Sequence, residues 1–467
     1  MRCTAHFWRL KPPLKTANSN IVFYCSTAKN KFTSKLKGNF KMEISGKRMY
    51  SLLKKLNFVR LSTTEGEKRA AAIIADEVRE AGIDPKIETF MAPRYEIKKV
   101  KFEVTEPEAR EYEVSGYGFS GNAAKDGIEA DFYYLESFDE MCLAEAKGKI
   151  VFVAGGVGVE NYKKLVKAGA LAFVSTCGTW TDKKSETDLD ERMLRPIHTD
   201  EGVIPGVCMR IADGLRLVAS KPKKVKLTLE QEEGEAESQN IVAEIPGTKF
   251  PEEVIVYTAH YDSVVFSPGM FDNASGSATI LELLRYFAKN PPLRTLKFIF
   301  CGSEERGLLG SKAYVEAHKD ELKNYRLCVN VDMTGPLLGF DCVRVMGGAS
   351  LCYALEFMKK EIGYATEIRQ DIYSSDAIPF ADNGIPGVNF IRTAADGTTR
   401  VHTRYDVITQ VDPAKMARTA AFALEFSKRT INAVYFPIER KLPEEIAEKV
   451  EVYLRKKKPE KKDKSFK

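Results

Sequence analysis

The chain has 467 residues, of which 44% are apolar and 29% are charged, and these values indicate a globular protein of two or three domains. No run approaches the ~20 apolar residues that a membrane helix needs, which argues against a membrane protein. The formal net charge of +6 is concentrated at the two ends, whereas residues 42–454 carry a net charge of −9, which argues against a nucleic-acid-binding surface.

The two ends of the chain differ in composition from the rest. Residues 1–41 hold nine Lys or Arg and no acid, so they fit either a basic targeting peptide or an upstream extension, with the natural start at Met42. We favour the extension, because Met42 opens the first well-patterned segment. Residues 441–467 are expected to form a charged helix that ends in a solvated, Lys-rich tail.

Apolar spacing predicts an inserted domain after two helices and two strands. Residues 106–235 have short apolar runs and frequent turns but no cluster of His, Cys or carboxylates, so we expect an insert without chemistry of its own. An acidic linker over 231–237 is predicted to lead out of it. Helices are expected over 47–56, 70–81, 161–168 and 212–219, and strands over 85–90, 95–104, 149–153, 171–174 and 225–229.

The remaining chain is predicted to form a mostly parallel sheet. Runs rich in β-branched and aromatic residues over 254–259, 296–300 and 327–331 are typical of buried parallel strands. The sequence therefore predicts an α/β fold with a mixed, mostly parallel central sheet flanked by helices, and with a smaller α/β or β-rich inserted domain. The main domain would be discontinuous, comprising residues 42–105 and 236–440.

Polar residues follow each of these three strands. The sequence His-Tyr-Asp occupies 260–262, two glutamates occupy 304–305, and Asp332 follows the third strand. Because ligands of open α/β sheets bind beyond the carboxyl ends of the strands, we expect these side chains to share one crevice. Residues two apart in an extended chain face the same way, so Asp262 can fix the ring of His260, although an ordinary polar loop is the alternative.

Two further segments carry candidate ligands. Asp272 precedes a helix over 278–288, where the helix N-terminus favours an acid and where a capping role is the alternative. His402 lies in a polar turn before the last long helix. The other histidines have no comparable setting, and His318 is expected to be solvated in a charged patch.

The order of these motifs resembles that of the zinc aminopeptidases and related carboxypeptidases of family M28. The resemblance runs from Arg60 to about Leu424, apart from the insert, and it is carried by TAHYDSV, GMFDNASGSA, GSEERGLLGS, NVDMTG and HTRYD. It implies a phosphorylase/hydrolase-like fold for the main domain. The stretches GKIVFVAGG and LVKAGALAFV resemble the protease-associated domain that some of these enzymes carry as an insert.

The resemblance implies a co-catalytic pair of divalent metal ions. His260 and Asp332 would hold one metal, Glu305 and His402 would hold the other, and Asp272 would bridge them. Mixed histidine and carboxylate ligation suits zinc, which is the metal we expect.

The resemblance also assigns catalytic roles. Glu304 would be the general base, and Asp262 would orient the first metal-binding histidine. Tyr373 is the candidate for the hydroxyl that stabilises the oxyanion, with Tyr405 as the alternative. Ala377 departs from the family pattern, because many relatives carry a larger polar residue there.

These features predict an exopeptidase that removes N-terminal residues from peptides. Related proteins of the same fold include carboxypeptidases, other amide hydrolases and glutaminyl cyclases, and Arg392, Arg400 and Arg404 could form the cationic clamp of a carboxypeptidase. A non-catalytic binding module is disfavoured because all the ligands are present. We expect a peptide substrate and no nucleic-acid or membrane partner, and the sequence leaves the oligomeric state open. The nine cysteines form no CxxC pair, which favours free thiols in a reducing cytoplasm.

Overall fold

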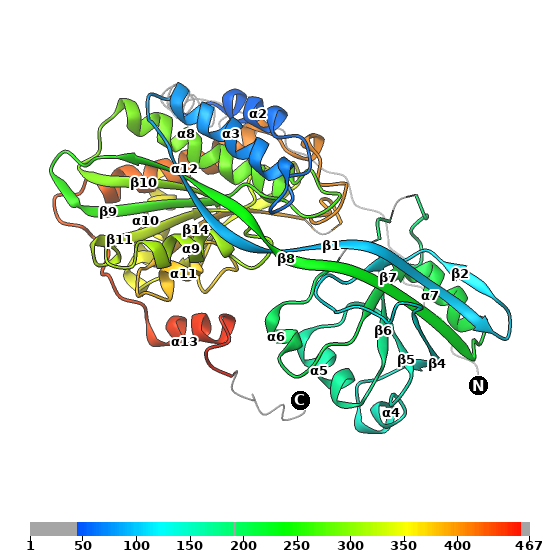
Figure 1. Ribbon diagram of the computed structural model, residues 1–467. Coiled ribbons are helices and arrows are strands. Elements are labelled where there is room, and N and C mark those ends of the chain that lie inside the picture. The colour runs from blue at the N-terminus through cyan, green and yellow to red at the C-terminus, as the bar shows by residue number, and fades with distance from the viewer. Residues whose placement is uncertain (1–43, 186, 190–191, 396, 459–467) are drawn as a thin grey trace, which may run out of the picture. The chain divides into compact units, whose positions relative to one another are not determined.

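The computed structural model describes residues 44–185, 187–189, 192–395 and 397–458 (Figure 1). The predictions for residues 1–41 and for the end of the Lys-rich tail lie outside these ranges. None of the helices in the described ranges combines the length and apolar character that crossing a bilayer requires. The seven cysteines in these ranges are free thiols, and five of them are buried.

The described residues form a mixed sheet of fourteen strands. Seven neighbouring strands make up the part that contains the predicted central strands. Their order is β13-β12-β14-β11-β9-β10-β8. In this part β9, β10, β11 and β14 are parallel neighbours, and β8 and β12 run antiparallel to β10 and β14. The predicted mixed, mostly parallel α/β sheet is therefore confirmed. The bounds are β8 (Lys224–Ile245), β9 (Phe250–His260), β10 (Arg294–Cys301), β11 (Tyr325–Val331), β12 (Gly339–Met346), β13 (Glu367–Gln370) and β14 (Gly387–Ala394).

Helices cover both faces of this part of the sheet (Figure 1). Alternate strand residues enter opposite cores, with Ile255 and Tyr257 in one buried cluster and Val254 and Val256 in the other. The first cluster is closed by α2 (Gly46–Lys55), α3 (Glu65–Glu80), α8 (Ser275–Lys289), α10 (Ala349–Ile362) and α12 (Pro413–Ile431). The second is closed by α9 (Leu309–Ala317), α11 (Ile378–Ala381) and α13 (Glu444–Tyr453). Short η1 (Met270–Ala274), η2 (Leu322–Asn324) and η3 (Ile408–Gln410) complete this part.

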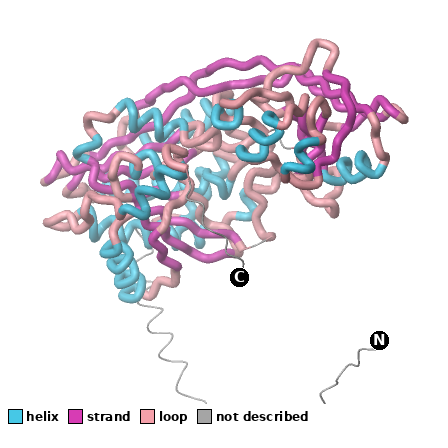
Figure 2. The backbone as a smooth tube through the Cα atoms, turned by 90° about the horizontal axis from the view of Figure 1, so that it is seen from below, coloured by secondary structure: helices cyan, strands magenta, loops and turns pink. Residues whose placement is uncertain are grey.

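Two long antiparallel strands connect this part to the remaining strands. Strand β1 (Lys86–Glu106) pairs with β8 along its whole length, and Figure 2 shows the pair as two strands running side by side. The predicted separate strands over 85–90 and 95–104 are thus one strand. Pro93 is tolerated inside it because β1 pairs only with β8 at that point.

The acidic linker predicted over 231–237 is wrong, because this segment lies within β8. Its acids are compatible with a strand because β1 supplies basic neighbours, as in the ion pair between Lys98 and Glu232 at 3.2 Å. The run of acids concealed a strand whose partner lies far away in the sequence.

The residues between β1 and β8 form a second, smaller arrangement of strands and helices. Strands β4 to β7 are parallel neighbours in chain order, with their own buried clusters around Phe152 and Val151 on opposite faces. The division into domains at 106 and 235 remains a prediction, since β1 and β8 run through both parts. The elements are β2 (Arg110–Tyr112), β3 (Ser115–Gly116), β4 (Ile128–Leu135), α4 (Glu140–Ala144), β5 (Ile150–Val153), α5 (Val159–Lys167), β6 (Ala172–Cys177), α6 (Pro196–Thr199), β7 (Gly206–Arg210) and α7 (Ile211–Ala219).

Candidate active site

The carboxyl ends of the three central parallel strands bring the predicted ligands together. His260 is the last residue of β9, Asp332 directly follows β11, and Glu304 and Glu305 follow β10 after a short turn. These strands are hydrogen-bonded neighbours, with β9 between β10 and β11. Ligands of open α/β sheets bind beyond the carboxyl ends of the strands. The structure places these side chains together at that edge of the sheet, as predicted.

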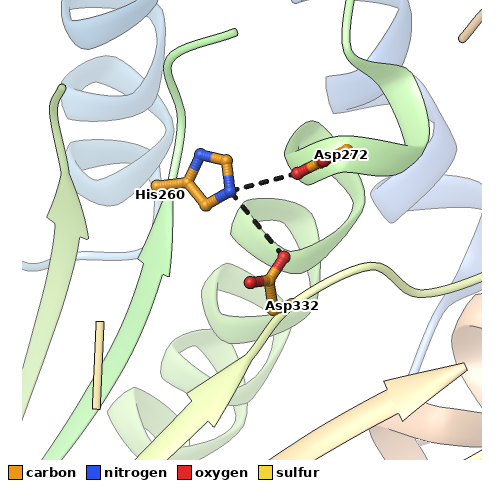
Figure 3. A group of neighbouring side chains, drawn as sticks. All are labelled: His260, Asp272 and Asp332. Carbon is orange, nitrogen blue, oxygen red and sulfur yellow. Dashed lines mark ion pairs between the residues drawn. The ribbon is translucent and has the colours of Figure 1, made fainter. Parts of the chain in front are cut away.

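Two groups of potential ligands share Asp272. The first comprises His260, Asp272 and Asp332, in which the His260 Nε2 atom lies 3.2 Å from Asp272 Oδ1 and 3.7 Å from Asp332 Oδ1 (Figure 3). In the second, His402 Nε2 lies 3.2 Å from Asp272 Oδ2 and 3.2 Å from Glu305 Oε2. Each Asp272 oxygen therefore faces a different histidine.

Asp272 is positioned by hydrogen bonds to its neighbours rather than by capping α8. The carboxylate of Asp406 accepts hydrogen bonds from the backbone N–H groups of Phe271 at 2.7 Å and Asp272 at 3.0 Å. The α8 N-cap is Ala274, without a side-chain cap. The alternative that Asp272 is a capping acid is therefore wrong.

Asn273 joins the start of α8 to the strand end that carries Asp332. Its amide donates to the carbonyl of Val331 at 3.0 Å, and its side-chain oxygen accepts from the N–H groups of Gly276 at 2.8 Å and Met333 at 3.0 Å. A Cβ atom on Gly276 would lie 2.3 Å from the Val331 carbonyl oxygen, so only glycine allows this approach.

Asp262 holds the turn that contains the two glutamates. Its Oδ1 accepts from the N–H of Glu304 at 3.0 Å and its Oδ2 from the N–H of Glu305 at 3.2 Å. The same Oδ1 lies 3.4 Å from His260 Nδ1. Asp262 thus contacts the imidazole it was predicted to orient, and it also fixes the backbone of the glutamate pair.

Glu67 supports the same turn from α3, and sequence reasoning missed this role. Its carboxylate is buried and accepts from the N–H of Ser303 at 2.9 Å and the hydroxyl of Ser238 at 3.0 Å. It also accepts from the backbone N–H of Thr63 at 2.7 Å, two residues before the start of α3. Ser303 has a left-handed backbone with φ of 53°, so these contacts hold a conformation that non-glycine residues rarely adopt.

The electrostatics of the site are dominated by crowded carboxylates. Burial raises the pKa of Glu304 well above its usual value, and the charges of Glu305 and Asp332 add to this shift. Burial opposes the charge of Asp272, but hydrogen bonds to both histidines lower its pKa overall. Hydrogen bonds to Asp272 and Glu305 raise the pKa of His402 to about 11.

The donor set fits divalent cations. Glu305 Oε1 and Asp332 Oδ1 are buried and have no hydrogen-bond partner among the residues that the structure describes, so each oxygen has a free electron pair. Two imidazoles with three carboxylates are ligands that zinc prefers, and cations would offset the crowded negative charge.

The two tyrosine candidates have different surroundings. Burial and the charges of Asp332 and Asp272 raise the pKa of Tyr373 well above its usual value, so its hydroxyl stays a proton donor next to these acids. Tyr405 instead lies under the guanidinium of Arg400, 5.4 Å from ring centroid to Cζ, beside a cavity of about 450 Å³. The charges of two candidate ligands thus act on Tyr373, whereas the ring of Tyr405 contacts a cation.

Each of the three arginines considered for a carboxylate clamp has an acidic partner. Arg392 is buried, lies 3.4 Å from Asp341, and donates to backbone carbonyls. Arg400 lies 3.4 Å from Asp182, and Arg404 forms an ion pair with Asp188.

His318 is not solvated, contrary to the prediction from its charged neighbours. Its ring stacks on Tyr314 with centroids 4.2 Å apart, and its Nε2 lies 3.0 Å from a carboxylate oxygen of Glu88. His318 directly follows α9, and its side chain is 14% exposed and lies against Glu88 of β1.

Known proteins are similar in sequence to most of this chain. The sequence profile described as Peptidase family M28 matches residues 240–427. Aminopeptidase YwaD of Bacillus subtilis (strain 168) is 31% identical over 369 residues, covering 75% of this chain and 76% of that protein. Carboxypeptidase Q of Bos taurus is 26% identical over 392 residues, covering 78% of this chain and 80% of that protein.

A solved structure supports the same relationship. The structure of BSAP, a zinc aminopeptidase from Bacillus subtilis, superposes with a TM-score of 0.72 at 25% identity, covering 86% of this chain and 99% of that one. The range that the profile matches, residues 240–427, spans the positions of all five candidate ligands and of Glu304. The chain therefore belongs to peptidase family M28 and is a hydrolase that acts on peptide bonds.

Proposed function

We propose that the protein is an aminopeptidase that removes N-terminal residues from peptides at a centre of two divalent metal ions, which we take to be zinc. The observation that carries this proposal is the pair of ligand groups that share Asp272, each with one histidine and one further carboxylate. Divalent cations at such a site supply Lewis acidity, which activates water and polarises the scissile carbonyl. A free substrate amine fits beside the acidic residues, which favours cleavage at the amino end.

Glu304 moves the proton in the proposed reaction. Its carboxylate takes a proton from the attacking water and donates it to the leaving amine. Its side chain is only 12% exposed and lies 3.9 Å from His260 Nε2, so the acid is placed beside the ligand groups, where it can hold this proton between the two steps. Asp262 keeps Glu304 in place through its backbone N–H.

Tyr373 stabilises the oxyanion in this mechanism, and its replacement by phenylalanine is expected to lower kcat by about 10²–10³-fold with little change in KM. The phenylalanine variant keeps the ring and removes only the O–H donor. Tyr405→Phe is the matched control and should change kcat only slightly. Steady-state kinetics on one peptide substrate will separate the two, and a larger loss in the Tyr405 variant would reverse the assignment.

Turnover of aminoacyl-p-nitroanilides, with and without a chelator, tests the function directly. We expect chelator-sensitive hydrolysis of substrates with a free α-amine and none of the same substrates after N-acetylation. A panel of side chains in this assay also gives the residue preference. Hydrolysis of blocked substrates alone would contradict the aminopeptidase proposal.

A second candidate is cleavage at the carboxyl end. Arg392, Arg400 and Arg404 already have acidic partners, which argues against the clamp considered from the sequence. Arg195, however, lies beside the turn of the glutamates, with its Cζ 3.9 Å from the position of a Cβ atom on Gly307. It lines a cavity of about 370 Å³ with Arg306 and several apolar side chains, a setting that suits a peptide carboxylate.

Peptides blocked at either end distinguish the two candidates. An N-acetylated peptide with a free carboxylate should remain intact if the protein is an aminopeptidase, and should lose its last residue if it acts at the carboxyl end. In the second case Arg195→Gln should raise KM, whereas Arg110→Gln, at an exposed position on β2, should not.

We further propose that the insert is of the protease-associated type and narrows access to the cleft. We also propose that the free thiols reflect a cytoplasmic setting.

A further inference from the structure

We propose that Asp188 and Asp182 of the insert are positioning residues for His402, so that one of the two metal positions depends on the insert and the other does not. The inference rests on the proposed two-metal function. It assigns to the residues between β1 and β8 a role in assembling the metal centre itself, in addition to any role in substrate access.

His402 is the ligand with the least support from secondary structure. It lies in a turn between β14 and η3, and its side chain is 54% exposed, compared with 2% for His260. Its backbone is left-handed with φ of 59°, a conformation that non-glycine residues adopt only when their surroundings impose it. The position of this imidazole therefore depends on what holds the turn.

One side of the turn is held from within the main sheet region. Asp406 accepts hydrogen bonds from the N–H groups of Phe271 and Asp272, which ties the residues after His402 to the shared ligand. The hydroxyl of Thr403 donates to the carbonyl of Arg400 at 2.6 Å, so the turn itself is compact.

The outer side of the turn is held by the insert. Arg404 forms an ion pair with Asp188, and the backbone N–H of Arg404 lies 3.4 Å from Asp188 Oδ2. Arg400 lies 3.4 Å from Asp182. The two arginines stand on either side of His402 in the sequence, so the insert contacts the turn before and after the ligand.

The insert presents these acids from a well-connected loop. Asp182 accepts hydrogen bonds from the N–H of Thr179 at 3.0 Å and the hydroxyl of Thr187 at 2.9 Å. Asp188 has a side chain that is only 8% exposed, and its carbonyl accepts from the thiol of Cys177 at the end of β6 at 3.4 Å. The side chain of Arg210, at the end of β7, donates to the carbonyl of Thr187 at 2.8 Å.

The two ligand groups therefore differ in their support. The group of His260 and Asp332 is built on the ends of β9 and β11, in the interior of the sheet. The group of His402 and Glu305 needs a turn whose outer side is fixed across the boundary to the insert. Loss of the insert contacts should weaken metal binding at the second group and leave the first unchanged.

Zinc titration of the metal-free full-length chain against a chromophoric competing chelator tests this inference. We expect two binding steps in the unchanged protein. In the double variant Asp182→Asn/Asp188→Asn, the zinc affinity of one step should fall by about 10–100-fold, which is the range typical of lost outer-shell partners. The affinity of the other step should stay unchanged. Arg404→Gln should reproduce the effect of Asp188→Asn, and adding it to Asp188→Asn should cause little further loss, because both remove the same pair.

Asp200→Asn is the matched control, because it breaks an ion pair with Lys163 at 2.7 Å that lies wholly within the insert. It should leave both binding steps unchanged, and thermal unfolding of the metal-free variants will show whether the substitutions destabilise the chain equally. Two unchanged steps in the Asp188 variants, or equal weakening of both steps, would overturn the inference. A single step in the unsubstituted protein would overturn the two-metal function as well.

Discussion

Replacement of Glu304 by glutamine is expected to lower kcat by about 10²–10⁴-fold with little change in KM or in metal content. The amide matches the shape of the carboxylate, and the backbone N–H of residue 304 can still donate to Asp262 at 3.0 Å. What the variant loses is the capacity to take a proton from water and return it to the leaving amine. Steady-state and pre-steady-state turnover of a peptide substrate will measure the loss.

The control for this prediction is Glu316→Gln, because Glu316 is an exposed glutamate on α9 whose ion pair with Lys319, at 3.7 Å, lies at the surface. Its replacement should leave turnover unchanged. Intact turnover in the Glu304 variant would exclude this residue as the general base. A parallel loss of metal would instead indicate that Glu304 acts as a ligand.

Replacement of Asp272 by asparagine is expected to weaken both metal-binding steps together and to abolish turnover. Each carboxylate oxygen faces a histidine at 3.2 Å, and asparagine replaces one of these oxygens by an N–H donor while removing the negative charge. The metal affinity of each step should fall by more than the loss of about 10–100-fold that removal of an outer-shell partner causes. Competition titration and elemental analysis of the dialysed protein will measure it.

Asp332→Asn provides the comparison for Asp272→Asn, because Asp332 belongs to only one of the two ligand groups. Its replacement should weaken one binding step. Equal effects of the two variants on a single step would show that Asp272 does not bridge two ions. Loss of both steps in the Asp332 variant would show that the two positions fill cooperatively.

The central strands and the residues at their ends could be predicted because both signals are local. Short runs of β-branched residues indicate buried parallel strands. The carboxyl ends of such strands meet at one edge of the sheet, so the residues that follow them are expected to lie in one crevice. His260, Asp332 and the two glutamates were therefore accessible from the sequence. The assignment of each residue to a metal ion depends on the order of all the motifs along the chain. Each motif alone is also compatible with a surface loop or a helix cap.

The supporting residues could not be predicted because their partners are distant in the sequence. Glu67 and Ser303 are 236 positions apart, and Asp188 and Arg404 are 216 positions apart. Periodicity describes a residue's own element and says nothing of such pairs. The same limitation explains why the acids over 231–237 suggest a linker when the sequence is considered alone, since the strand with which they pair, β1, is distant in the sequence.

The β1–β8 pair has a consequence for the order in which the chain folds. β1 leaves the ribosome before the segment between β1 and β8, residues 107–223, and β8 leaves after it; β8 also provides the antiparallel neighbour of β10. The entropic cost of pairing β1 with β8 is smaller once this segment has folded, because its two ends, which join the paired residues Glu106 and Lys224, are then held close together. Folding of the segment between β1 and β8 should therefore precede completion of the main sheet, and a defect in its buried clusters would delay maturation of the enzyme even where every candidate catalytic residue is intact.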